Sequence, residues 1–149
     1  MRTAGNRSGT LLRRGVAAVE MALVLPVFIA VVLGIIEFGR AMWVSNLVTN
    51  SAREGGRMAV LDGSSNAQVK QAISDFLTST LGVSSGDITT TITITPYTGN
   101  ANPANVCANA HSRDLISISV ALPFNKVALV SGNYLNGKTL TGKCAMRHE

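Results

Sequence analysis

Residues 13–36 read RRGVAAVEMALVLPVFIAVVLGII, and this stretch decides how the rest of the chain is interpreted. Two arginines and Gly15 lead into an apolar run, and no residue from Met21 to Ile36 is charged. A helix needs ~20 mostly apolar residues to cross the hydrocarbon core of a bilayer. We therefore predict a membrane-spanning helix over about residues 16–39.

One carboxylate, Glu20, lies near the start of this run, five residues after Gly15. An ionised carboxylate inside the bilayer costs at least ~2.5 kcal/mol, so a glutamate at this position marks a functional hypothesis. The alternative is that Glu20 lies at the level of the lipid headgroups and is simply hydrated.

The formal net charge of +5 is concentrated at the N-terminus. Arg2, Arg7, Arg13 and Arg14 precede the apolar run without an acidic residue among them, and without these four the chain has nine basic and eight acidic residues. This distribution predicts a cytoplasmic N-terminus, with everything after the span on the other side of the membrane. It argues against nucleic-acid binding, as does an aromatic content of 5%.

An ordinary secretory signal peptide fits the segment poorly. The apolar stretch is longer than a usual signal core, and no A-x-A cleavage site follows it. A lipoprotein signal would need a cysteine at the end of the run, where none occurs. We prefer cleavage between Gly15 and Val16, ahead of the apolar run, and the alternative is an uncleaved signal anchor.

Beyond the span, the pattern predicts a small α+β domain. The long helix continues to about residue 60, where the turn Leu61-Asp62-Gly63-Ser64-Ser65 ends it and Asn66 is a candidate cap for a second helix. That helix carries an apolar stripe at helical spacing: Val69, Ala72, Ile73, Phe76, Leu77 and Leu81.

Three segments alternate apolar and polar residues, as half-buried strands do. They lie around Ile92, around Ile118 and around Cys144. We predict a second helix packed on an antiparallel sheet of three to four strands. The expected organisation is a basic leader over 1–15, a long helix over 16–60 and an extracytoplasmic α+β domain over 61–149.

Cys107 and Cys144 are the only cysteines, and both follow the span. On an oxidising side of the membrane two cysteines allow one disulfide, which would pin the loop around Cys107 to the last strand. The alternative is two unpaired buried thiols.

No enzyme signature occurs. His111 and His148 are the only histidines, and neither an HExxH, a GxSxG, a P-loop nor a GxGxxG motif is present. We therefore expect no catalytic residues, no metal site and no cofactor. Glu37 and Arg40, three residues apart at the end of the span, are interpreted as an exposed ion pair that ends it, with no further role.

The layout resembles the TadE/TadF-like minor pseudopilins of the tight-adherence (Flp) pilus system. The resemblance rests on RRGVAAVEMALVLPVFIAVVLGIIEFGRAM at 13–42, SAREGGRMA at 51–59 and KTLTGKCAMRHE at 138–149. The chain departs from the family pattern at Met21, where an aromatic residue is common.

The resemblance implies a single-pass protein of the bacterial inner membrane that acts in pilus biogenesis and surface adhesion. It implies cleavage after Gly15 by a prepilin peptidase, and association with other pilins and with inner-membrane assembly proteins. The Glu20 carboxylate would then neutralise the α-amine that cleavage exposes on Val16 of a neighbouring subunit. The alternatives are an uncleaved, membrane-anchored accessory protein that scaffolds a secretion or pilus machine and, less favoured, an enzyme or adhesive binding domain on a membrane stalk.

Overall fold

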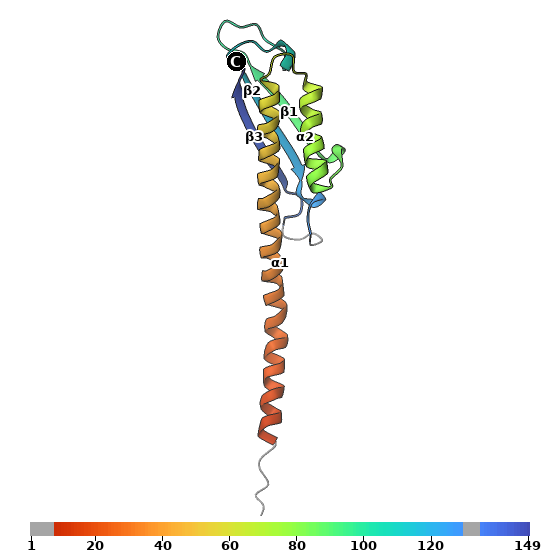
Figure 1. The fold of residues 1–149 in the computed structure, drawn as a ribbon. Helices are drawn as coiled ribbons and strands as arrows, with labels where there is room; N and C mark the ends of the chain where they lie inside the picture. Colours follow the sequence, from red (N-terminus) through yellow and green to blue (C-terminus); the bar gives the residue numbers. More distant parts are fainter. Residues whose placement is uncertain (1–7, 130–134) are drawn as a thin grey trace, which may run out of the picture. The chain divides into compact units, whose positions relative to one another are not determined.

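The computed structural model describes residues 8–129 and 135–149, with side chains described from Gly15 onward. The elements in order are α1 (Ser8–Ala59), α2 (Asn66–Leu81), β1 (Thr89–Thr95), β2 (Leu115–Pro123) and β3 (Thr139–Arg147), as labelled in Figure 1. Three short 3-10 helices lie between them: η1 (Ser85–Asp87), η2 (Cys107–Asn109) and η3 (Phe124–Lys126). The predicted α+β fold, with a long N-terminal helix, a second helix and an antiparallel sheet, is confirmed.

The chain divides into two compact units, residues 1–36 and 37–149. In the first unit, every described side chain from Gly15 to Val31 is exposed, and these residues are almost all apolar. An apolar helix whose described side chains are exposed on every face suits a lipid environment. The helix begins at Ser8, so residues 8–15 of the predicted basic leader are helical and continuous with the apolar helix. Leucine and arginine, which fill residues 11–14, are good helix formers.

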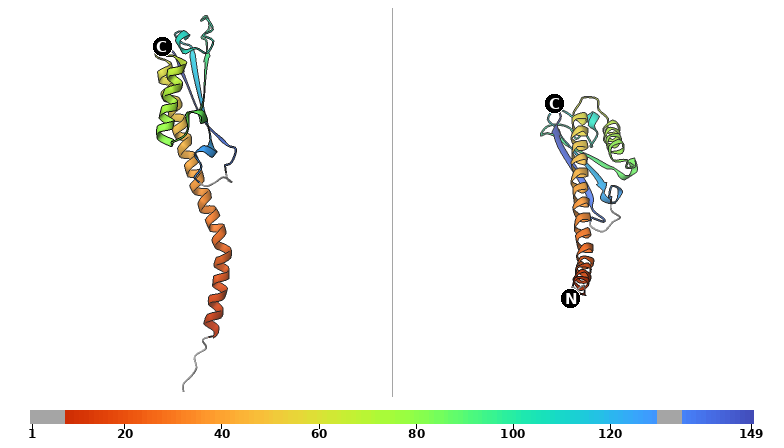
Figure 2. Two further views of the ribbon diagram at one scale, coloured as in Figure 1. Left: turned by 90° about the vertical axis from the view of Figure 1, so that its right-hand side faces the viewer. Right: turned by 60° about the horizontal axis from the view of Figure 1, so that its bottom comes forward.

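The second unit is a three-stranded antiparallel sheet with two helices on one face. The strand order is β1-β2-β3, and both pairings are antiparallel. Residues 37–59 of α1 and all of α2 lie on the same side of the sheet, and the opposite side is left open (Figure 2).

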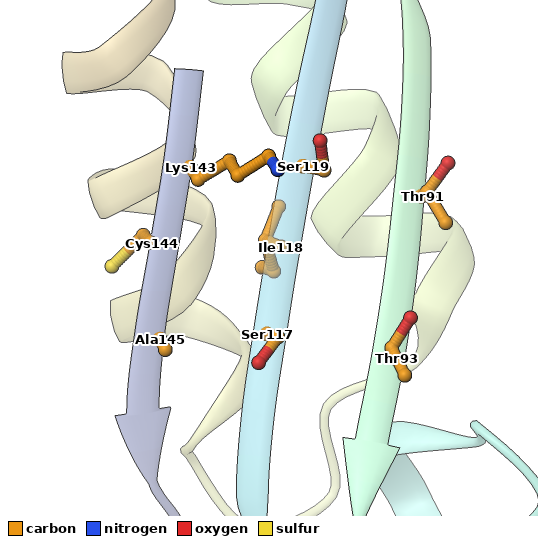
Figure 3. A pocket seen from close by; sticks show the side chains of 8 residues that line it. All are labelled: Thr91, Thr93, Ser117, Ile118, Ser119, Lys143, Cys144 and Ala145. Carbon is orange, nitrogen blue, oxygen red and sulfur yellow. The ribbon is translucent and has the colours of Figure 1, made fainter. Parts of the chain in front are cut away.

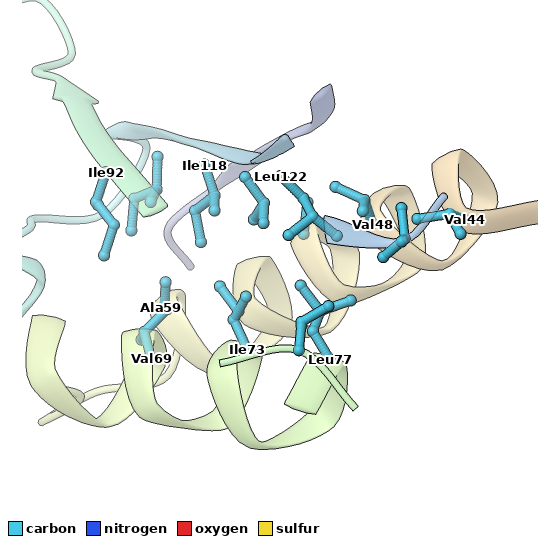
Figure 4. Packing of buried hydrophobic residues seen from close by; sticks show 14 of the residues in the cluster. Val44, Val48, Ala59, Val69, Ile73, Leu77, Ile92, Ile118 and Leu122 are labelled. Carbon is cyan, nitrogen blue, oxygen red and sulfur yellow. The ribbon is translucent and has the colours of Figure 1, made fainter. Parts of the chain in front are cut away.

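The core forms where the apolar stripes of both helices meet the inner face of the sheet (Figure 4). From α1, Val44, Val48 and Ala52 are completely buried, as their helical spacing predicts. The other fully buried members are Ala59 at the end of α1 and eight residues from α2, β2 and η3: Val69, Ile73, Leu77, Ile116, Ile118, Val120, Leu122 and Phe124.

Ser65, rather than Asn66, caps α2. The Ser65 hydroxyl accepts a hydrogen bond from the Gln68 amide and the Gln68 side chain accepts one from the Ser65 amide, which together form a capping box. Asn66 is thereby free to bind the distant loop, where its side chain donates to the Asn105 carbonyl and accepts from the Cys107 amide.

Two glycines permit the close packing of α1 against its neighbours. A Cβ added at Gly142 in β3 would lie 2.6 Å from the backbone of Val48 and of Thr49. On α1, a Cβ added at Gly55 would lie 2.4 Å from the Cδ1 atom of Ile73 in α2. Strand β3 therefore rests directly on the helix backbone, which cannot move aside for a methyl group.

Asp114 organises the loop between β1 and β2. It is fully buried and accepts hydrogen bonds from the Tyr97 amide at 2.8 Å, the Asn100 side-chain amide at 2.7 Å and the His111 amide at 2.9 Å. These bonds, that of Asn100 above all, lower the pKa of Asp114 to about 2. The loop is thus held by one ionised carboxylate.

We predict that Gly142→Ala destabilises the second unit by about 1–3 kcal/mol, because the methyl group meets backbone atoms that cannot yield. Urea unfolding in detergent micelles, followed by the fluorescence of Trp43, measures the change. The matched control is Gly86→Ala, since the nearest atom to a Cβ there is 3.9 Å away. Equal effects of the two substitutions would contradict the close contact.

We predict that acid removes the stability that Asp114 provides. Its pKa is lowered from 3.8 to about 2 in the folded protein, so the contribution is complete above about pH 4 and is lost as the pH falls toward 2. Urea midpoints across this range should fall less steeply in Asp114→Asn than in the unmodified protein. Asp75→Asn, at an exposed carboxylate of α2, should leave the steepness unchanged.

Candidate functional site

Gly15, Val16 and Glu20 all lie on α1 in the first unit. Val16 is 69% exposed, Glu20 is exposed, and a Cβ added at Gly15 would have no atom within 4 Å. Val16 and Glu20 are four residues apart, so they share one face of the helix on successive turns. The structure thus places the predicted junction and the predicted carboxylate side by side on an accessible helix surface.

Among the side chains that the structure describes, in residues 15–129 and 135–149, none forms a hydrogen bond or ion pair with Glu20. A charge in an apolar segment gains most from a partner of opposite charge, because the surrounding dielectric is low.

The end of the predicted span holds an arrangement that the sequence did not reveal. Glu37 is 1% exposed, so it is buried in the second unit and does not form part of an exposed ion pair. Arg40 donates its Nε hydrogen to the Val127 carbonyl, 87 residues away, and its guanidinium lies 5.6 Å from the centre of the Trp43 ring. The interpretation of Glu37 and Arg40 as simple span terminators is wrong, because both take part in the folding of the second unit.

The predicted disulfide between Cys107 and Cys144 is not formed. Both residues are free thiols in the structure. Cys144 faces α1, where its sulfur lies 3.2 Å from the position of a Cβ on Gly56, whereas Cys107 lies in η2 with its amide bound to Asn66. The thiols face different neighbours, and the Asn66 side chain holds the loop in place of a covalent bond.

Cys107 is also a poor candidate for chemistry. It is 3% exposed, and burial raises the pKa of its thiol. A buried, protonated thiol is a weak nucleophile. No group of three or more histidine, cysteine or carboxylate side chains in the described part of the chain is arranged to hold a metal ion.

The open face of the sheet carries a shallow hollow of about 500 Å³ (Figure 3). Hydroxyl side chains from β1 and β2 surround it, and the Lys143 side chain extends across β2 toward Ser119. No histidine, carboxylate or aromatic side chain lines the hollow, so it lacks both an acid–base pair and a stacking platform. Its lining residues are Thr91, Thr93, Ser117, Ile118, Ser119, Lys143, Cys144 and Ala145.

One helix in the described residues, Gly15–Ala59, is long and apolar enough to cross a membrane. Residues 15–57 also match the family model described as TadE-like protein. No curated protein and no solved structure matches the chain. The family match starts at Gly15 and ends just after Gly55 and Gly56, so it covers the apolar helix together with the face on which α2 and β3 pack.

The TadE-like family is associated with Tad/Flp pilus systems and is not known for enzymatic activity. The apolar helix and the family match together indicate a single-pass membrane protein. The resemblance to the TadE-like proteins is therefore confirmed over residues 15–57, the part of the chain that holds the apolar helix.

Proposed function

We propose that this protein is a minor pseudopilin-like component of Flp/Tad pilus assembly, made as a precursor and cleaved between Gly15 and Val16 by a prepilin peptidase. The observation that carries the proposal is the TadE-like match, which starts at Gly15 and continues through the apolar helix. Its role is structural, in pilus biogenesis and surface adhesion, and its partners are other pilins and the assembly proteins of the inner membrane. It performs no catalysis of its own.

The charge distribution supports an orientation across the inner membrane. The four leader arginines favour the cytoplasmic side, because basic residues beside a span are retained there. Residues 37–149 are then extracytoplasmic, where the pilus is built. In this arrangement the peptidase reaches Gly15 from the membrane or its cytoplasmic surface.

The proposed junction is accessible but helical. The side chains that follow it are exposed, and Gly15 itself presents only backbone. A glycine inside a helix is ~1 kcal/mol less favourable than an alanine, so the helix opens more easily there than elsewhere. Local opening would let a protease active site approach the Gly15–Val16 peptide bond without a side chain in the way.

After cleavage, Glu20 acquires a role in assembly. The new α-amine of Val16 is a cation at the end of an apolar helix, and Glu20 is an anion one turn further on. Each charge is costly in hydrocarbon, and a pair between neighbouring subunits relieves both. Because the pair forms at a single axial offset between two parallel helices, it selects the register of the assembly.

An uncleaved anchored protein that scaffolds the machine is the second candidate. The continuity of α1 from Ser8 through Gly15 and Val16 favours it, since an intact helix is a poor protease substrate. The two candidates differ at the N-terminus of the mature chain.

We predict that membrane-purified protein, co-expressed with its prepilin peptidase, begins at Val16. Gly15→Leu should leave the full-length precursor, because its side chain blocks approach to the peptide bond. Gly39→Leu is the matched control, since that helical glycine also has open space around it, and it should be processed normally. N-terminal sequencing gives the answer, and an N-terminus before Gly15 in all membrane-embedded protein would favour the anchored scaffold.

We predict that Glu20→Gln is inserted and cleaved like the unmodified protein but assembles poorly. A neutral amide costs less than a carboxylate in the bilayer, so insertion should become easier by up to ~2–3 kcal/mol. Crosslinking to pilus components and the number of pili should fall while the protein level stays normal. Glu54→Gln, at an exposed glutamate of the second unit, is the control and should retain normal crosslinking and a normal number of pili. Normal piliation in Glu20→Gln would remove this carboxylate from the mechanism.

A further inference from the structure

The second unit exposes large apolar side chains close to the point where α1 enters it. Phe38 is 58% exposed, Met42 66% and Trp43 47%, and Leu129, from the connection between η3 and β3, is 63% exposed. We call these four residues, together with Lys138, the Phe38 patch. Phe38, Met42 and Lys138 line one hollow, and Arg40 connects Trp43 with the Val127 carbonyl, two residues before Leu129. Single exposed apolar residues are ordinary, but several large ones near one stretch of a helix indicate a binding function.

Two distant parts of the chain are brought together at this patch. The bond from Arg40 to the Val127 carbonyl holds the connection against α1, and Leu129 follows two residues later. A hollow of about 350 Å³ lies between α1, η3 and the residues around the start of β3, and most of the lining of this hollow is apolar. The lining residues are Phe38, Ala41, Met42, Ser45, Asn46, Phe124, Leu135, Lys138 and Leu140.

The charges around the patch are cationic. Lys138 is exposed beside the hollow and forms no ion pair within the described residues. The Arg40 guanidinium lies over the Trp43 ring. Lys126 is neutralised by Asp87 at 2.9 Å, and Glu37 is buried beneath the surface. The accessible charge therefore suits an anion.

The position of the patch along α1 points to the headgroup of an anionic phospholipid as this anion. A hydrocarbon core ~30 Å thick takes up ~20 residues at 1.5 Å per residue, which brings a span starting at Val16 to its end near Ile35. Phe38, Met42 and Trp43 then fall within the next two turns or so, at the depth of the headgroups. Aromatic rings, long apolar side chains and basic groups are the residues that this layer accommodates.

We propose that the Phe38 patch is a membrane-binding surface, by which the folded unit itself rests in the headgroup layer and holds anionic phospholipid through Lys138 and Arg40. Leu129 and Lys138 then enter the membrane interface although they lie some 90 residues after the span in sequence. This second contact restrains the unit on the bilayer and sets its orientation when it meets a neighbouring subunit. This proposal requires that α1 crosses the membrane. It requires neither cleavage after Gly15 nor the pairing of Glu20 with a neighbouring subunit.

The test uses the full chain in vesicles that contain a phosphatidylcholine brominated near the top of its acyl chains, a quencher of tryptophan fluorescence. In a Trp43→Phe background, one protein carries Leu129→Trp and the matched control carries Leu61→Trp. The two leucines are equally exposed, at 63%, but Leu61 follows the far end of α1, ~25 Å beyond Met42 along the helix. Flotation with the vesicles and far-ultraviolet circular dichroism verify that both proteins are inserted and folded.

We expect strong quenching and blue-shifted emission for the tryptophan at position 129, and neither for that at position 61. Adding phosphatidylglycerol should strengthen the quenching at 129. Lys138→Gln should reduce the ratio of docked to undocked units by about fivefold in the anionic vesicles, while Lys143→Gln, on the open face of the sheet, should not.

Equal, weak quenching at positions 61 and 129 in every vesicle would overturn the proposal and leave the patch for a protein partner. Quenching at 129 that ignores both phosphatidylglycerol and Lys138→Gln would overturn the assignment of an anionic lipid. The unmodified protein offers an independent measurement, since Trp43 is its single tryptophan. Its emission should respond to phosphatidylglycerol and to Lys138→Gln in the same direction, and a Trp43 insensitive to both would also count against the proposal.

Discussion

The contact of β3 with the backbone of α1 is the constraint on which the second unit depends. Strand β3 crosses the helix at Gly142, where no side chain fits between the strand and the backbone of Val48 and Thr49. This approach brings the inner face of the sheet down onto the buried stripe of α1. Helix α2 closes the same core from the side, where Gly55 leaves room for Ile73.

The two parts of α1 therefore suit two different environments. Through Val31 its described side chains are exposed and almost all apolar, which suits lipid. From Val44 onward only one stripe is apolar, and that stripe is buried by the sheet and by α2. The change occurs around Glu37 and Arg40, where the helix first gains tertiary contacts with the distant connection between η3 and β3.

The polar groups of the second unit mainly stabilise its loops by hydrogen bonds. Asp114 gathers three amides of the loop between β1 and β2, and Asn66 ties the start of α2 to the same loop near Cys107. Such bonds are strong when the acceptor is ionised and buried, because unpaired amides there would cost free energy. Glu20 differs from these groups, because it lies outside this unit and is exposed.

Periodicity alone determined much of this protein. The run from Met21 to Ile36 predicts the apolar helix, the spacing of Val69, Ile73 and Leu77 predicts the buried face of α2, and the alternation around Ile118 predicts a strand. These signals are local, since each depends on which residues share one face of one element.

Only the tertiary structure decided which groups from different elements meet. Sequence spacing does not show that Arg40 binds the carbonyl of Val127, that Asp114 is surrounded by amides, or that Cys107 and Cys144 face different neighbours and remain free thiols. It also favoured Asn66 over Ser65 as the cap of α2, because both are good caps and the choice depends on the loop that Asn66 binds. The Phe38 patch likewise needed the folded chain, since Phe38 and Lys138 line one hollow only after β3 has packed on α1.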